Sequence, residues 1–153
     1  PFMKDTNGVI RKLYDVNAEY TLLIFFGPDC GHCKKELPKV KKVVDSLTGP
    51  PKFLSWPLHK SIDVQVYAVQ TEFDEKLWKN FIINQGTGDW INVGDILTDP
   101  EGNPAASSNW RDQYDIYSTP VIYLLDKDKK ILAKRISYTQ ISQIISRIEE
   151  QKK

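Results

Sequence analysis

Residues 25–38 of the 153-residue chain read Phe-Phe-Gly-Pro-Asp-Cys-Gly-His-Cys-Lys-Lys-Glu-Leu-Pro. The stretch begins in an apolar run, Thr21 to Phe26, that predicts a strand buried on both faces. Gly27-Pro28 ends this strand, and an amphipathic helix is predicted from there to Gly49. The apolar stripe of that helix consists of Leu37, Val40, Val43, Val44 and Leu47. Both cysteines therefore fall in the first turn of a helix that follows a central strand.

Cys30 and Cys33 are the only cysteines in the chain. Two thiols separated by two residues at a helix start can close a small disulfide ring with little movement of the backbone. Unpaired N–H groups and the helix dipole stabilise a thiolate there, so that its pKa falls from about 8.5 to roughly 3.5–7.5. We therefore predict that Cys30 is the nucleophile. Cys33, one turn further in, is predicted to attack the mixed disulfide that Cys30 forms.

The charge balance excludes some classes of partner. The chain has 21 Lys and Arg against 20 Asp and Glu, a net charge of +1 that gives no overall field to attract nucleic acid or an anionic membrane. Its longest apolar runs have five residues, whereas a membrane-spanning helix needs roughly 20. We expect neither a nucleic-acid partner nor a membrane-spanning segment in this chain.

A metal site is not expected either. A closed four-thiolate zinc site needs a second cysteine pair, and the only histidine outside the motif is His59. The predicted thiol chemistry also requires no cofactor.

The rest of the chain alternates between predicted strands and helices. In chain order these are a strand at Ile62 to Ala68, a helix that ends at Gly86, a hairpin of Val121 to Leu125 with Ile131 to Ile136, and a terminal helix. Residues 86–109 are rich in Gly, Asn, Asp, Pro and Ser and predict an irregular excursion. Val9 to Leu13 predicts an added edge strand. We expect one domain over residues 1–153.

Two of the predicted helices begin with a capping-box pattern, in which a hydroxyl residue is followed three positions later by an acid or amide. The first pair is Thr71 with Asp74, and the second is Ser137 with Gln140. These pairs predict where the second and the terminal helix begin.

The sequence resembles the thioredoxin superfamily in three places. They are the Cys-Gly-His-Cys motif, Pro38 five residues after Cys33, and Thr119-Pro120 at the start of a strand. The resemblance implies an α/β thioredoxin-like fold, a central mixed β-sheet flanked by helices, here with an added N-terminal strand region and a central insertion. It also implies that the Thr119-Pro120 bond is cis and that Gly31, Thr119 and Pro120 contact the substrate.

Within the superfamily, the motif is similar to the TlpA-like branch of periplasmic thiol:disulfide oxidoreductases, where a Glu follows the second cysteine by three residues, as Glu36 does here. Cys-Gly-His-Cys also matches the motif of protein disulfide isomerases. The resemblance implies protein thiol or disulfide substrates, a redox donor protein, and a location in the periplasm or on the outer side of the cell envelope. Because the chain begins at Pro1, we expect a fragment of a longer exported protein.

Four positions near the cysteines bear on the chemistry. Asp29 replaces the aromatic residue of the family and opposes a neighbouring thiolate. Ile24 stands where thioredoxins carry a buried acid, and Glu36 is predicted to replace that acid by taking the proton of Cys33. His32 is predicted to stabilise the thiolate of Cys30. The alternatives are a surface acid paired with a lysine for Glu36 and an exposed histidine without effect for His32.

These residues predict a thiol:disulfide oxidoreductase that acts on proteins. A peroxiredoxin is excluded because Leu23 and Gly27 occupy the positions of its essential Pro and Thr. A non-catalytic thioredoxin-like binding module of a larger exported protein is the alternative, and the intact cysteine pair argues against it.

Overall fold

The computed structural model describes residues 3–49, 61–72, 74–95 and 114–152. Within these residues, six strands form one mixed sheet in the order β1-β4-β3-β2-β5-β6. The strands are β1 (Met3–Asp5), β2 (Tyr20–Phe26), β3 (Val64–Gln70), β4 (Ile91–Asp95), β5 (Val121–Leu125) and β6 (Ile131–Ala133). The helices are η1 (Leu13–Asp15), α1 (Gly31–Thr48), α2 (Glu75–Gln85) and α4 (Tyr138–Gln151).

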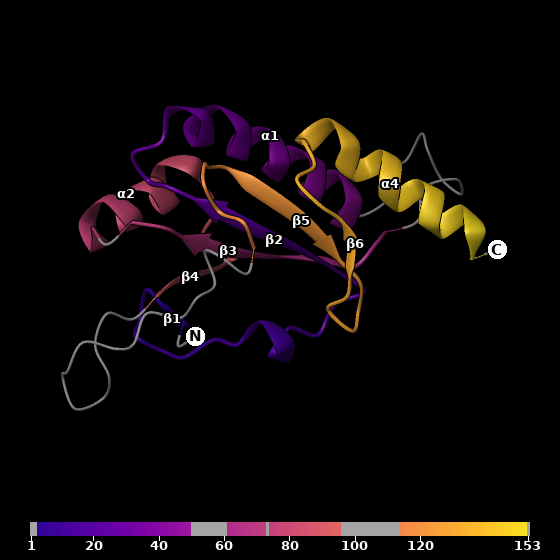
Figure 1. Ribbon diagram of the computed structural model, residues 1–153, viewed down its shortest axis with the longest axis horizontal. Helices are drawn as coiled ribbons and strands as arrows, with labels where there is room; N and C mark the ends of the chain where they lie inside the picture. The colour runs from indigo at the N-terminus through magenta and orange to yellow at the C-terminus, as the bar shows by residue number, and fades with distance from the viewer. Residues whose placement is uncertain (1–2, 50–60, 73, 96–113, 153) are drawn as a thin grey trace.

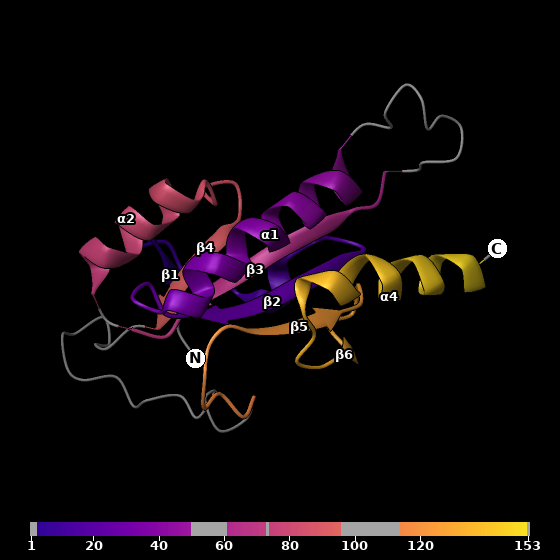
Figure 2. The same cartoon turned by 90° about the horizontal axis from the view of Figure 1, so that it is seen from above.

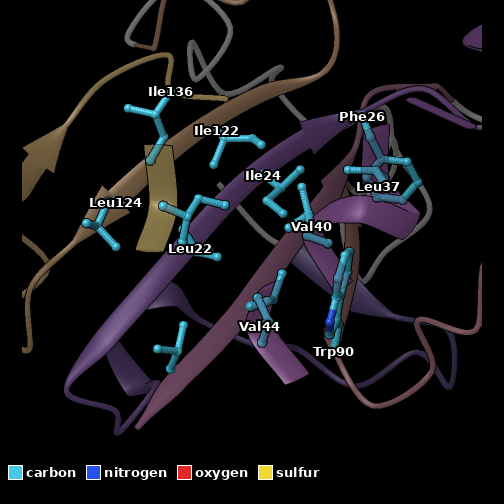
Figure 3. Close-up of a cluster of buried hydrophobic side chains, with 14 of the residues drawn as sticks. Leu22, Ile24, Phe26, Leu37, Val40, Val44, Trp90, Ile122, Leu124 and Ile136 are labelled. Atoms are coloured by element: carbon cyan, nitrogen blue, oxygen red, sulfur yellow. The ribbon is translucent and has the colours of Figure 1, made fainter. Parts of the chain in front are cut away.

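Strand β2 lies at the centre of the sheet, as its apolar run predicts. It pairs with β3 in parallel and with β5 antiparallel, and all of its residues are buried. Leu22, Ile24 and Phe26 point toward the helices, where they meet apolar side chains of α1 such as Leu37 and Val40 (Figure 3). The intervening residues of β2 belong to a second apolar cluster on the opposite face. Burial on both faces explains why the sequence of β2 is apolar throughout rather than alternating.

The helices α1, α2 and α4 cover the same face of the sheet (Figures 1 and 2). Pro38 lies inside α1. On α4, Ile141 and Ile145 are fully buried at a spacing of four residues, which places them on one side of the helix. The helix predictions for these three segments are confirmed.

The opposite face of the sheet is covered by the segment that contains η1. Met3, Val16 and Ala18 pack there against Leu23, Phe25 and other side chains of the sheet. The Tyr67 hydroxyl donates a hydrogen bond of 2.5 Å to the carbonyl of Arg11, which fixes this segment on the sheet. Among the described helices, α1, α2 and α4 therefore lie on one face of the sheet, and η1 lies on the other.

Two predictions about strands were wrong. The added N-terminal strand is β1, whereas Val9 to Leu13 forms no strand and contributes only a bridge between Ile10 and Lys4. Residues 91–95, predicted as irregular, form β4 between β1 and β3. Pairing on both sides stabilises this short strand, and such long-range pairing leaves little periodic signal in five residues.

One of the two predicted helix starts also needs correction. Asp74, not Thr71, caps α2, since its carboxylate accepts a hydrogen bond of 2.9 Å from the Leu77 N–H. The Thr71 hydroxyl donates instead to the carbonyl of Phe26 at 3.2 Å. The capping box of α4 is confirmed, because Gln140 Oε1 accepts from the Ser137 N–H at 2.9 Å. In the described part of the chain, no helix combines the length and apolarity needed to cross a membrane.

Candidate active site

Cys30 is the N-cap residue of α1, directly after the loop that leaves β2. Its backbone N–H donates to the carbonyl of Gly27 at 3.0 Å, which closes the loop into a tight turn. Its sulfur accepts a hydrogen bond of 3.2 Å from the N–H of Cys33. The thiol therefore occupies the capping position, where the helix start offers N–H groups that have no partner within the helix.

This position gives Cys30 a pKa below the ordinary value for cysteine. Partial burial, the largest single influence, raises the pKa, but hydrogen bonds with the side chains of Cys33 and Thr119 and with the backbone N–H groups of Cys33 and His32 together outweigh it. A lower pKa increases the thiolate fraction near neutral pH. The helix start thus stabilises the reactive form of this residue.

Cys33 has the opposite electrostatic setting. Its side chain is fully buried among apolar residues of β2 and the helices. This burial, followed by the hydrogen bond with Cys30, raises the pKa of Cys33 to about 12. Both cysteines are free thiols in this structure. The two sulfurs therefore differ both in exposure and in proton affinity.

The Thr119-Pro120 peptide bond is cis, as expected. The Cys30 thiol donates to the carbonyl of Thr119 at 3.4 Å, although the two residues are 89 positions apart in the chain. The start of β5 and the start of α1 therefore meet at the Cys30 sulfur.

The predicted substrate-binding and tuning residues surround this point. Gly31, His32 and Asp29 are exposed. Apart from the residues next to it and the backbone of α1, no described atom would lie within 4 Å of a methyl group added at Gly31. Exposure of Asp29 lets solvent screen its charge. The only described contact of His32 with the Cys30 sulfur is through its backbone N–H.

Glu36 lies one turn beyond Cys33 on α1. Its side chain is 32% exposed, and its Oε1 lies 3.6 Å from the Nζ of Lys39. The alternative interpretation of Glu36, a surface acid paired with a lysine, predicts an ion pair of this kind. The proton-transfer role stays a prediction.

The structure adds one acid that sequence reasoning missed. A methyl group added at Gly27 would lie 2.7 Å from Oε1 of Glu72 and 3.4 Å from Cβ of Cys30. The Glu72 carboxylate therefore lies against the loop that carries Cys30. Glu72 follows β3, the parallel neighbour of β2. The sequence could have indicated this position, because residues that follow adjacent parallel strands meet at one edge of the sheet.

Within residues 3–49, 61–72, 74–95 and 114–152, no group of three or more His, Cys, Asp or Glu side chains is placed to hold a metal ion. His59 lies outside the described residues.

A family model described as a thioredoxin-like domain matches residues 10–152. A domain of a possible thiol-disulfide isomerase from Cytophaga hutchinsonii is 36% identical, with a TM-score of 0.72 over 99% of this chain and 89% of that one. The thioredoxin domain of a thiol-disulfide oxidoreductase from Bacteroides vulgatus is 25% identical, with a TM-score of 0.69 over 93% of this chain and 90% of that one. No curated protein matches the sequence.

The chain belongs to the thioredoxin-like domain family, and its fold is the α/β thioredoxin-like fold with a six-stranded mixed sheet. It is structurally close to bacterial thiol-disulfide oxidoreductases and isomerases, and it carries a Cys-x-x-Cys pair at Cys30 and Cys33.

Proposed function

We propose that this chain is a thiol:disulfide oxidoreductase that exchanges disulfides with protein substrates. The observation that carries the proposal is the contrast between its two cysteines, a partly exposed Cys30 with a lowered pKa and a buried Cys33 with a raised one. An exchange cycle needs one thiolate that attacks a partner and a second thiol that stays protonated until the first has reacted.

In the direction of reduction, the Cys30 thiolate attacks one sulfur of the substrate disulfide and forms a mixed disulfide, while the other substrate sulfur leaves as a thiolate. Cys33 then loses its proton and attacks the Cys30 sulfur. The second substrate sulfur departs as a thiolate and takes up a proton. Two electrons pass to the substrate, and the chain is left with a Cys30–Cys33 disulfide that a redox donor protein reduces.

The same proposal places the chain in the TlpA-like branch, with a motif of the protein-disulfide-isomerase type and a location in the periplasm or on the outer side of the cell envelope. The support is Glu36 at its position in the motif, the letters of Cys-Gly-His-Cys, and the added N-terminal strand β1.

Reduction of insulin driven by dithiothreitol tests the proposed activity. The chain is expected to shorten the lag before insulin precipitates, and a variant with both cysteines replaced by serine is expected to leave it unchanged. If the unaltered chain gives only the uncatalysed rate, the binding-module alternative is favoured and the proposed activity is refuted.

Glu36 is expected to act in the second step. Glu36→Gln removes the group that is proposed to accept the Cys33 proton, so release of the reduced substrate is expected to slow on the order of 100-fold, the lower end for general base catalysis. Formation of the mixed disulfide is expected to change little. Rapid quenching of single turnovers, with the mixed disulfide resolved by mass spectrometry, separates the two steps.

Glu75→Gln is the matched control, because Glu75 also pairs with a lysine on a helix surface, Lys79 at 2.7 Å, but belongs to α2 and not to the helix that carries Cys33. Equal slowing of both steps by Glu36→Gln, or no slowing, would leave Glu36 as a surface acid without a part in the mechanism.

A further inference from the structure

Side chains of the sheet and of the segment after β6 hold Tyr114 and Asp115, the first described residues before the cis proline. The ring of Tyr114 packs against Phe25 and Tyr123, with centroid distances of 5.4 and 5.6 Å. The Tyr123 hydroxyl donates a hydrogen bond to the carbonyl of Tyr114, and the Arg135 guanidinium donates one to the carbonyl of Asp115. These contacts fix the backbone of the loop on the sheet before it reaches the active site.

The next residues of the loop alternate between inward and outward positions. Ile116 is half-buried and packs against the apolar cluster on the face of the sheet opposite the helices. Tyr117 points outward and is 81% exposed, the highest fraction among the large hydrophobic side chains described. An anchored loop therefore presents an aromatic ring to solvent.

The residue that carries this exposed ring lies close to Cys30. Tyr117 precedes Thr119 by two residues, and the Thr119 carbonyl lies 3.4 Å from the Cys30 sulfur. Two residues span at most about 7 Å. A polypeptide whose cysteine is joined to Cys30 therefore has its neighbouring side chains within reach of the ring.

Exposure alone does not indicate a binding residue, because single exposed apolar side chains are common on protein surfaces. Tyr14 on η1 is 80% exposed, but Figure 1 shows η1 well away from the first turn of α1. What distinguishes Tyr117 is its anchored backbone, its closeness to Cys30, and the exposure of Gly31 beside that cysteine. Tyrosine also suits recognition, since it offers a large apolar ring with only two side-chain torsions to fix.

We propose that Tyr117 is a client-docking residue, whose ring contacts an aromatic or aliphatic side chain near the reactive cysteine of an extended polypeptide. The inference rests on the proposed function and names its substrate class. These are polypeptide disulfides with an apolar residue one to three positions from the cysteine, which the site prefers to small disulfides. The electron transfer is unchanged from the cycle described above.

The test compares three disulfides in single turnovers of the previously reduced chain. They are glutathione disulfide, a peptide disulfide with Phe two residues from its cysteine, and the same peptide with Ser in place of Phe. Tyr117→Ala is expected to lower the second-order rate constant for the Phe peptide about 3- to 10-fold, the range of one aromatic pair. The rate constants for the Ser peptide and for glutathione disulfide are expected to stay within about twofold, since neither presents a ring to Tyr117.

Two variants complete the comparison. Tyr117→Phe keeps the ring and is expected to retain the preference for the Phe peptide, and Tyr14→Ala removes an equally exposed tyrosine and is expected to leave all three rate constants unchanged. Equal slowing with all three disulfides would mean that Tyr117 only shapes the loop, and an unchanged preference in Tyr117→Ala would mean that the ring does not dock the client. Either result overturns the docking role while the activity stands. If the unaltered chain reduces none of the three disulfides, the proposed function itself fails, and docking fails with it.

Discussion

Cys33→Ser is expected to stop turnover and to accumulate a mixed disulfide between Cys30 and the protein substrate. Cys30 keeps its helix-start position in this variant and can still attack, but no second thiol remains to resolve the adduct. Cys30→Ser is expected to form no adduct, because the buried Cys33, with a pKa of about 12, has almost no thiolate at neutral pH. Insulin reduction is expected to fall to the uncatalysed rate in both variants, whereas only Cys33→Ser gives a shifted band on non-reducing gels.

The pH dependence of alkylation checks the same assignment without a substrate. The pKa of Cys30 is lowered, so the rate at which iodoacetamide modifies it is expected to level off at a lower pH than for a free cysteine, whose pKa is about 8.5. Cys33 is expected to remain unmodified throughout this range, and mass spectrometry of proteolytic fragments tells the two apart. Faster labelling of Cys33 than of Cys30 at pH 6 would reverse the proposed roles.

Local patterns were enough to predict the core of this site. The apolar run of β2, the helical stripe of α1 and the two cysteines between them are contiguous in the sequence, so the strand, the helix and the capping position of Cys30 follow from a short stretch. The contact between Cys30 and Thr119 is different in kind. It joins residues 89 positions apart, and no local pattern predicts it.

The features that were missed depend on strand order. Strand β4 has five residues and is held by β1 and β3 on either side, so its stability arises from pairing that no local pattern reveals. The position of β1 depends in turn on β4, its partner. Glu72 reaches the loop before Cys30 because β3 lies beside β2, and this closeness can be predicted only once the strand order is known.

The predicted role of His32 in setting the redox potential can be tested with two variants, His32→Pro and His32→Ala. We expect the potential of the unaltered chain to lie between that of thioredoxin, about −270 mV, and that of protein disulfide isomerase, about −180 mV. The N–H groups of the helix start stabilise the thiolate, and hence the reduced form, and we predict that the His32 imidazole adds to this effect. Asp29 opposes them weakly, because it is exposed.

His32→Pro removes both the imidazole and the backbone N–H that helps to lower the pKa of Cys30, whereas His32→Ala removes the imidazole alone. Proline is tolerated in the first turn of a helix, so neither variant should disturb α1. Loss of thiolate stabilisation destabilises the reduced form, so His32→Pro is expected to lower the potential by about 30 mV or more, roughly a tenfold change in the equilibrium constant. The pKa of Cys30 is expected to rise in parallel.

Equilibration with glutathione buffers gives the redox potentials of His32→Ala and His32→Pro. The difference between the two variants separates the effect of the imidazole from that of the backbone N–H. A fall in His32→Ala that approaches the fall in His32→Pro assigns the potential to the imidazole, as predicted. If His32→Ala matches the unaltered chain while His32→Pro falls, the backbone N–H carries the effect and the identity of the side chain is incidental. An unchanged or higher potential in His32→Pro would remove residue 32 from control of the redox potential altogether.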